Sequence, residues 1–230
     1  MSLEGKTIAI TGAFGALGTA IVQAALARGM KVAALDRSAQ PHVPEALAGA
    51  HLFGGVDLGD AEAAAEAFAR IAAELGGLDA LVNVAGGFRW ETLDGGKLET
   101  WDQMFTMNLR TAVASSQAAL PHLLAHGGSI VNIGANGASK ATAGMGAYAA
   151  SKAGVARFTE ALAEELKDRG VTVNAVLPST IDTTANRADM PKADFSRWVQ
   201  PSQLADAILF LVSDQARAIT GALIPVVGRV

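Results

Sequence analysis

Tyr148 and Lys152 are four residues apart in a segment of helical pattern, so their side chains project from one face on neighbouring turns. A free phenol has a pKa of about 10 and exchanges protons poorly at neutral pH, but a nearby ammonium lowers that pKa by roughly 1–3 units. The pair therefore predicts proton transfer by Tyr148. Taken alone, the spacing is common, and a solvated pair on a helix surface is the alternative.

Gly12, Gly15 and Gly18 form a second group with a chemical use, between an apolar run at 7–10 and a helical pattern at 19–28. Glycine suits a tight turn, and it lets the backbone approach a pyrophosphate that sits on the free N–H groups of a helix. The order of strand, turn and helix predicts a dinucleotide-binding turn, although this glycine spacing also occurs in ordinary turns. The other members of the turn are Phe14, Ala16 and Leu17.

Asp36 ends the second apolar run, 18 residues beyond Gly18. A carboxylate at this place can accept hydrogen bonds from the adenosine ribose and repels the 2′-phosphate of NADP, so we expect NAD(H) to be preferred. Arg37 can partly offset this charge, which leaves NADP(H) as the alternative. An aspartate at a strand end can also simply cap a turn.

These residues are positioned by a regular alternation of apolar runs and Ala-rich segments of helical period. The runs are continuously apolar, which is typical of parallel strands covered by helices on both faces. We expect an α/β fold over 1–230, a single-domain doubly wound Rossmann fold with a parallel seven-stranded sheet flanked by helices. The expected strands are 7–10, 31–35, 51–56, 80–84, 129–133, 171–176 and 222–227.

The composition excludes several classes of protein. The 230 residues include no cysteine, which rules out disulfides and thiolate metal sites, and a net charge of −4 without a basic stripe argues against nucleic acid. No apolar run approaches the roughly 18 residues of a membrane span, and the first strand starts too early for a signal peptide. We expect a soluble cytoplasmic protein with no membrane partner. His122 and His126 lack a third ligand nearby, so we expect no metal site.

Short motifs follow the third and fourth expected strands, and a polar residue lies in the later helical segment. These residues are Asp57 and Leu58, then Asn83, Ala85 and Gly86, then Asn108. With the glycine turn and the tyrosine–lysine pair in order, the sequence resembles the short-chain dehydrogenase/reductase family over essentially its whole length. This joint pattern is specific, whereas each motif alone is weak.

The resemblance implies roles for these residues in binding a nicotinamide dinucleotide. Asp57 and Leu58 are then adenine contacts, and Lys152 also holds the nicotinamide ribose. The family pattern implies a proton relay through Asn108 and a cofactor wall made of Asn83, Ala85 and Gly86. The segment 178–183 then lies over the nicotinamide carboxamide. Its expected contacts are Pro178, Thr180, Ile181 and Thr183.

One departure from the family concerns the substrate. The resemblance implies a serine thirteen residues before the tyrosine that hydrogen-bonds the substrate carbonyl, and this chain has Ala135 there. Loss of such a donor costs about 10²–10³ in rate at comparable sites. Ser139 is the nearest hydroxyl in sequence, but at nine residues before Tyr148 it needs a rearranged loop.

Four features resemble the dihydropteridine reductase branch of the family: the glycine turn 11–18 with its shifted glycine, Ala135, Gly144-Met145 and the segment 182–198. This resemblance implies NADH-dependent reduction of a quinonoid dihydropterin without the serine, with Tyr148 as the proton donor. An aromatic slot could stack such a flat ring, although ordinary packing also explains each aromatic residue. The candidate substrate contacts are Phe88, Trp90, Ala135 and Met145. The Pro-containing segment 179–201 is expected to cover the substrate.

Two other functions remain open. Asn83 and Asn108 have the form usual for ordinary family members, which favours a carbonyl or alcohol oxidoreductase. A non-catalytic nicotinamide-binding redox sensor is the third possibility, and the intact tyrosine–lysine pair argues against it. The resemblance also implies a homodimer or homotetramer formed through the helices at 101–126 and 147–169, which are rich in small residues.

Overall fold

The computed structural model describes residues 3–230 and contains one sheet of seven strands. All neighbouring strands are parallel, in the order β3-β2-β1-β4-β5-β6-β7, so the predicted doubly wound fold is confirmed. The strands are β1 (Thr7–Thr11), β2 (Lys31–Leu35), β3 (His51–Phe53), β4 (Ala80–Asn83), β5 (Gly128–Ile133), β6 (Val171–Pro178) and β7 (Leu223–Val226).

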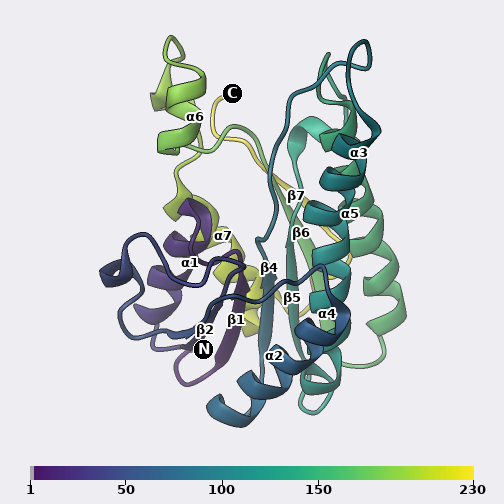
Figure 1. Ribbon diagram of the computed structural model, residues 1–230. Coiled ribbons are helices and arrows are strands. Elements are labelled where there is room, and N and C mark those ends of the chain that lie inside the picture. Colours follow the sequence, from purple (N-terminus) through teal and green to yellow (C-terminus); the bar gives the residue numbers. More distant parts are fainter. Residues whose placement is uncertain (1–2) are drawn as a thin grey trace.

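Helices cover both faces of the sheet (Figure 1). The principal helices are α1 (Ala16–Leu26), α2 (Ala61–Leu75), α3 (Leu98–Phe105), α4 (Thr111–Leu123), α5 (Gly146–Leu166), α6 (Thr184–Asp189) and α7 (Pro201–Val212). Short turns of 3-10 helix occur at η1 (Pro44–Leu47), η3 (Asn136–Ala138), η4 (Phe195–Arg197) and η5 (Asp214–Ala216), and a π-helical turn, η2 (Thr106–Arg110), joins α3 to α4.

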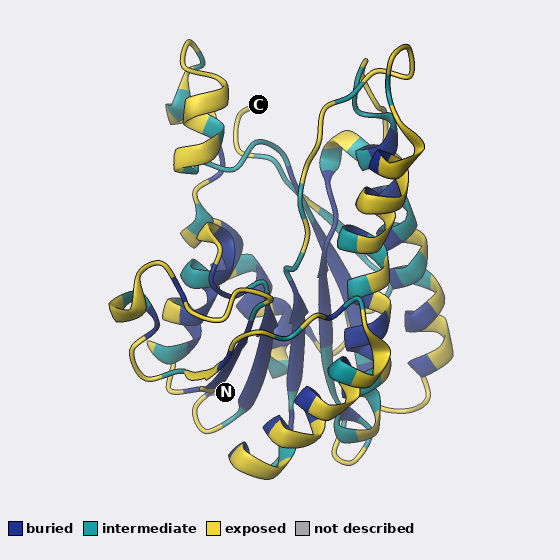
Figure 2. Ribbon diagram, in the orientation of Figure 1, coloured by how far each residue is buried: buried dark blue, intermediate teal, exposed yellow. Residues whose placement is uncertain are grey.

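Successive side chains of the buried strands point to opposite faces of the sheet, so the core has two layers. In β1, Ile8 and Ile10 pack under α1 and α7, whereas Ala9 packs toward α2, α4 and α5. Figure 2 shows the strands buried between helices whose outer faces are exposed. Continuous burial of the strand therefore follows from helices on both sides, as the apolar runs predicted.

Two element boundaries differ from the sequence-based expectation in ways that affect the cofactor turn and its surroundings. Helix α1 begins at Ala16, inside the glycine turn, instead of at residue 19. Strand β3 ends at Phe53 instead of residue 56, because Gly54 packs directly on the Ala39 carbonyl and Gly55 turns the chain with φ of +76°.

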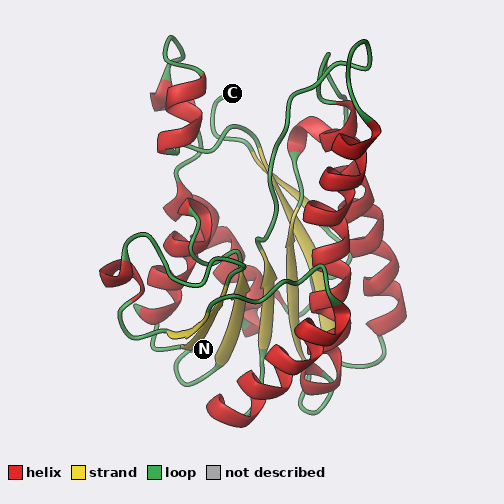
Figure 3. Ribbon diagram, viewed as in Figure 1, coloured by secondary structure: helices red, strands yellow, loops and turns green. Residues whose placement is uncertain are grey.

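The carboxyl edge of the parallel sheet carries the longer connections. Figure 3 shows the loop after β4 and the α6 segment rising beyond this edge, on opposite sides of it. Ligands of open parallel sheets bind outside the carboxyl ends of the strands. In residues 3–230 no helix is long and apolar enough to cross a membrane.

Candidate active site

The glycine turn is packed too tightly for side chains at two of its three glycines. Gly12 has φ of +61°, and a Cβ there would lie 2.9 Å from the Ala85 backbone. A Cβ on Gly18 would overlap the Gly12 carbonyl oxygen and lie 2.6 Å from the Ala13 Cα. Glycine at 12 therefore lets the turn approach the loop after β4, and glycine at 18 lets α1 approach β1.

The turn presents the amino end of α1 to an open cavity. Gly15 precedes the helix in an extended conformation and supplies no side-chain cap, so the first N–H groups of the helix lack a side-chain acceptor. These groups and the helix dipole suit an anion such as a pyrophosphate. The residues present therefore fit a dinucleotide at this position.

The cavity in front of the turn has a volume of about 660 Å³ and contains most of the residues predicted to bind the cofactor. Those that line it are Gly12, Gly15, Ala16, Leu17, Gly18, Asp36, Arg37, Asp57, Leu58, Ala85 and Gly86. They come from the carboxyl ends of β1, β2, β3 and β4, as expected for one edge of a parallel sheet.

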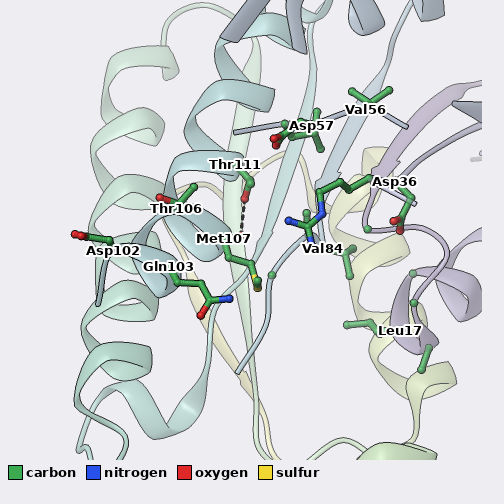
Figure 4. A pocket seen from close by; sticks show the side chains of 18 residues that line it. Leu17, Asp36, Val56, Asp57, Val84, Asp102, Gln103, Thr106, Met107 and Thr111 are labelled. Carbon is green, nitrogen blue, oxygen red and sulfur yellow. Dashed lines mark hydrogen bonds between the residues drawn. The ribbon is translucent and has the colours of Figure 1, made fainter. Parts of the chain in front are cut away.

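A second wall of this cavity comes from α3 and the turns that follow it, and the sequence analysis missed it. Figure 4 shows this wall facing Leu17, Asp36 and Val84. This wall consists of Asp102, Gln103, Thr106, Met107 and Thr111; Val56 and Val84, which follow β3 and β4, also line the cavity without having been predicted. Gln103, Thr106 and Met107 have the i, i+3, i+4 spacing of one helix face, which is a signal that the sequence did contain.

Asp36 is held in place by backbone donors. Its Oδ2 accepts a hydrogen bond from the Phe14 N–H at 3.0 Å, and its Oδ1 accepts one from the Ser38 N–H at 2.9 Å. The carboxylate thus caps a turn and also faces the cavity, so a capping role and a role in binding a ribose are compatible. In residues 3–230 the Arg37 side chain, which also lines the cavity, makes no hydrogen bond or ion pair.

Several residues predicted to bind the cofactor do not line this cavity, among them Phe14, Asn83, Tyr148 and Lys152. The Phe14 side chain is buried in the core under α1, and only its N–H takes part in the turn, through Asp36. The Asn83 amide points behind the sheet edge, where it donates to Ser116 Oγ at 3.0 Å and to Asn132 Oδ1 at 2.8 Å. Neither side chain lines the cavity in this structure, and contact of these two residues with a cofactor stays a prediction.

Asn108 is fully buried in the π-helical turn η2 and fixes the loop after β4. Its Oδ1 accepts from the Gly87 N–H at 2.8 Å, and its Nδ2 donates to Gly87 O at 3.1 Å and Ser151 Oγ at 2.9 Å. A Cβ on Gly86 would lie 2.6 Å from this Oδ1 and 3.4 Å from Lys152 Nζ. Asn108 and Lys152 therefore meet at Gly86, on the edge of the cavity.

Lys152 is buried on α5 and donates from Nζ to the Ile133 carbonyl oxygen at 2.7 Å. Burial lowers the pKa of this lysine to about 8, because an ammonium is poorly solvated there. It therefore remains mainly charged at neutral pH, close to its titration point.

Tyr148, one helical turn earlier, is half-buried, and its ring meets the edge of Phe88 with centroids 4.9 Å apart. Burial raises the pKa of Tyr148 to about 12. The prediction that Lys152 lowers this pKa is thus wrong in direction, because desolvation of the phenolate dominates. At neutral pH the hydroxyl keeps its proton and can donate it.

The loop after β4 lies against the segment before α5 and brings the predicted substrate residues together. Trp90 Nε1 donates to the Ala143 carbonyl at 3.0 Å, and the indole packs directly on Gly144, where φ is +76°. The Met145 methyl would lie 3.5 Å from a Cβ on Gly137. Phe88 and Trp90 remain 56% and 60% exposed, so both offer apolar surface to a ligand.

The segment after β6 is fixed by contacts at its base, and it does not line the 660 Å³ cavity. Pro178 ends β6, Ile181 forms a bridge with Val199, and the Thr183 hydroxyl caps α6 by accepting from the Asn186 N–H at 3.2 Å. These residues and Thr180 are absent from the walls of the cavity. Helix α6 has no buried residue, and Figure 3 shows it rising beyond the sheet edge. A role as a cover for substrate stays a prediction.

Comparison with known proteins identifies the same arrangement elsewhere. The chain is 36% identical over 237 residues to D-threitol dehydrogenase of Mycolicibacterium smegmatis, covering 96% of this chain and 90% of that protein. It is 34% identical to 3-oxoacyl-[acyl-carrier-protein] reductase FabG of Vibrio cholerae, covering 99% of this chain and 98% of that one.

Among solved structures, carveol dehydrogenase from Mycobacterium avium in complex with NAD superposes with a TM-score of 0.86. It is 30% identical in sequence, and the match covers 98% of this chain and 97% of that one. The family profile described as short chain dehydrogenase matches residues 6–194. The protein is therefore an oxidoreductase of the short chain dehydrogenase family.

Proposed function

We propose that this protein reduces a small carbonyl compound with NADH, or runs the reverse oxidation, with Tyr148 as the proton-transfer group. The observation that carries the proposal is the meeting of the cavity and the Lys152 ammonium at Gly86. This glycine lines the cavity, and the Lys152 ammonium lies beside it, one helical turn from the protonated Tyr148.

The nicotinamide cofactor would supply the hydride, held by the glycine turn, Asp36 and the residues around Gly86. Tyr148 then gives its hydroxyl proton to the carbonyl oxygen, so that the C=O bond becomes an H–C–O–H unit. Lys152 keeps a positive charge near the phenol and stabilises the phenolate that proton loss leaves behind. Asn108 holds the loop at Gly87 rigid, and its place in a proton relay is a separate part of the proposal.

The preference for NADH rests on Asp36. Its carboxylate is fixed at the cavity wall by two backbone N–H groups, so it cannot easily turn away from a 2′-phosphate. The unpaired Arg37 beside it supports some use of NADPH. The solved carveol dehydrogenase, which carries NAD, supports the same choice.

A second candidate is the reduction of a quinonoid dihydropterin. It is favoured by the buried methyl of Ala135, which offers no donor for a carbonyl, and by the exposed ring surface of Phe88 beside Tyr148 and of Trp90 in the same loop. A conjugated ring can accept a hydride and one proton from Tyr148 without a further donor.

The test compares three reactions: acetoacetyl thioester with NADH, D-threitol with NAD⁺, and quinonoid dihydropterin with NADH. We expect turnover of a carbonyl–alcohol pair, and a loss of at least 100-fold in kcat for Tyr148→Phe with NADH affinity retained. Preferred turnover of the dihydropterin selects the second candidate. NADH binding without turnover of any compound overturns both and favours a redox sensor.

A further inference from the structure

The carbonyl reaction proposed above lacks one expected donor. Ala135 is buried, and its methyl group cannot hydrogen-bond a substrate oxygen. Tyr148 alone would then face the negative charge that develops on that oxygen. A second donor at such a site is worth about 10²–10³ in rate, so its loss calls for a replacement.

Neighbouring hydroxyl groups are already used. Ser139 Oγ donates to the Asn136 carbonyl at 2.8 Å, Thr142 Oγ1 contacts Met145 S at 3.0 Å, and Ser151 Oγ donates to the Tyr148 carbonyl at 2.7 Å. A hydroxyl has one proton to donate, so none of these three has a free donor in this arrangement. Ser139, considered from the sequence as a weak substitute, is exposed and bonded to its own turn.

Asn136 follows Ala135 directly, and its carboxamide is free. Its main chain is fixed, because the Asn136 carbonyl accepts from both the N–H and the hydroxyl of Ser139. Within the described residues 3–230, the half-buried side chain makes no hydrogen bond. A carboxamide has two N–H donors, and both are therefore available to a ligand.

Contacts on both sides place Asn136 next to the start of α5. Before it, the Ile133 carbonyl accepts from Lys152 Nζ at 2.7 Å. After it, a Cβ on Gly137 would lie 3.5 Å from the Met145 methyl, three residues before Tyr148. The segment that contains Asn136 is thus held against the part of α5 that carries the proton donor.

We propose that the Asn136 side chain donates a hydrogen bond from Nδ2 to the substrate oxygen and takes the place of the missing hydroxyl. Hydride adds to the carbonyl carbon, the electron pair of the C=O π bond moves to oxygen, and Tyr148 delivers the proton there. Asn136 stabilises the developing charge and gives up no proton. This inference rests on the proposed carbonyl chemistry.

The experiment measures reduction of an acetoacetyl thioester, or the carbonyl that wild type prefers, by Asn136→Ala and Asn136→Asp. Both substitutions remove the N–H donors, and aspartate keeps the size of the side chain. We expect kcat to fall about 10- to 100-fold in each variant. NADH affinity and the melting temperature should stay at their wild-type values, which a merely structural role would not allow.

Restoring the hydroxyl provides a matched control. Ala135→Ser should raise kcat by a larger factor in the Asn136→Ala background than in the wild type, because a second donor adds less where one is already present. Wild-type kcat in Asn136→Ala, or an equal gain from Ala135→Ser in both backgrounds, overturns the assignment alone. Absence of carbonyl turnover in the wild type overturns the proposed function, and the assignment of Asn136 falls with it.

Discussion

Tyr148 and Lys152 are perturbed by the same physical cause in opposite directions. Burial disfavours the charged form of each group, which raises the pKa of the phenol and lowers the pKa of the amine. The pair is therefore a neutral phenol and, one helical turn away, an ammonium that is near its titration point. This state suits proton donation, which is the direction of carbonyl reduction.

The pH profile of reduction should follow Lys152. We expect kcat/KM to be level near neutral pH and to fall as the pH rises through about 8, because Lys152 loses its charge there while Tyr148 keeps its proton up to about 12. Lys152→Arg should move this fall to higher pH in whatever activity remains, since arginine stays charged. A profile that is level to pH 10 in the wild type would contradict this assignment.

We propose that Asp36 decides the choice between NADH and NADPH. Asp36→Asn keeps the size of the side chain and an acceptor for a backbone N–H but removes the charge, so NADPH binding should improve relative to NADH. We expect the ratio of kcat/KM for NADH over NADPH to fall at least tenfold. In the matched variant Arg37→Ala, NADPH use should fall and NADH use should persist. An unchanged ratio in Asp36→Asn would place the discrimination elsewhere.

At the scale of elements, Gly15 and Gly18 in the turn between β1 and α1 have different functions. Gly18→Ala forces a Cβ into the Gly12 carbonyl, so we expect it to lower the free energy of unfolding by about 1–3 kcal/mol. Gly15→Ala is the matched control, because its Cβ would meet only the Gly12 oxygen at 3.4 Å.

Gly15→Ala should therefore fold with wild-type stability and lose NADH affinity, since its methyl group faces the cavity that the backbone of the turn lines. Denaturant unfolding and NADH titration measure the two effects separately. Equal stability of both variants would show that the close approach of α1 to β1 is relaxed in solution.

The elements that a sequence predicts well are those with local signals. The strand at 7–11 is buried on both faces, and its continuous apolar run reveals this directly. The π-helical turn at 106–110 has no such local pattern, because it depends on Asn108 meeting Gly87 and Ser151 from distant segments. The cavity wall from α3 has a local signal in the spacing of Gln103, Thr106 and Met107, but that spacing does not tell which cavity the helix face meets.

The direction of a side chain at a strand end is also hard to predict. Asn83 ends β4 beside the cofactor turn, but Asn132 of β5 is its register partner in the sheet. The Asn83 amide therefore donates a hydrogen bond to Asn132 Oδ1. Similarly, the predicted pKa of Tyr148 considered the charge of Lys152 but not the burial of the ring, which needs the fold. Sequence motifs therefore located the residues of this site better than they described their environment.

At the scale of the whole molecule, we propose that the helices at 101–126 and 147–169 form the contact of a homodimer or homotetramer. Phe105 on α3 and Val113 on α4 are 54% and 39% exposed, and Trp101 lies one turn before Phe105. Large apolar side chains gathered along one helical layer favour a partner surface of the same kind.

Phe105→Glu combined with Val113→Glu should therefore reduce the mass of the particle in solution to that of one chain, 23.4 kDa, because each copy would bury carboxylates against apolar surface. Light scattering coupled to size exclusion measures this mass. Phe210→Glu is the matched control: its side chain is similarly exposed at 45%, but it lies on α7, on the opposite layer of the sheet. A monomeric wild type would contradict the proposed assembly, and dissociation by the α7 variant alone would place the contact away from α3 and α4.

If dissociation also lowers kcat, the cavity wall that includes Gln103 of α3 and Met107 of η2 links assembly to cofactor binding.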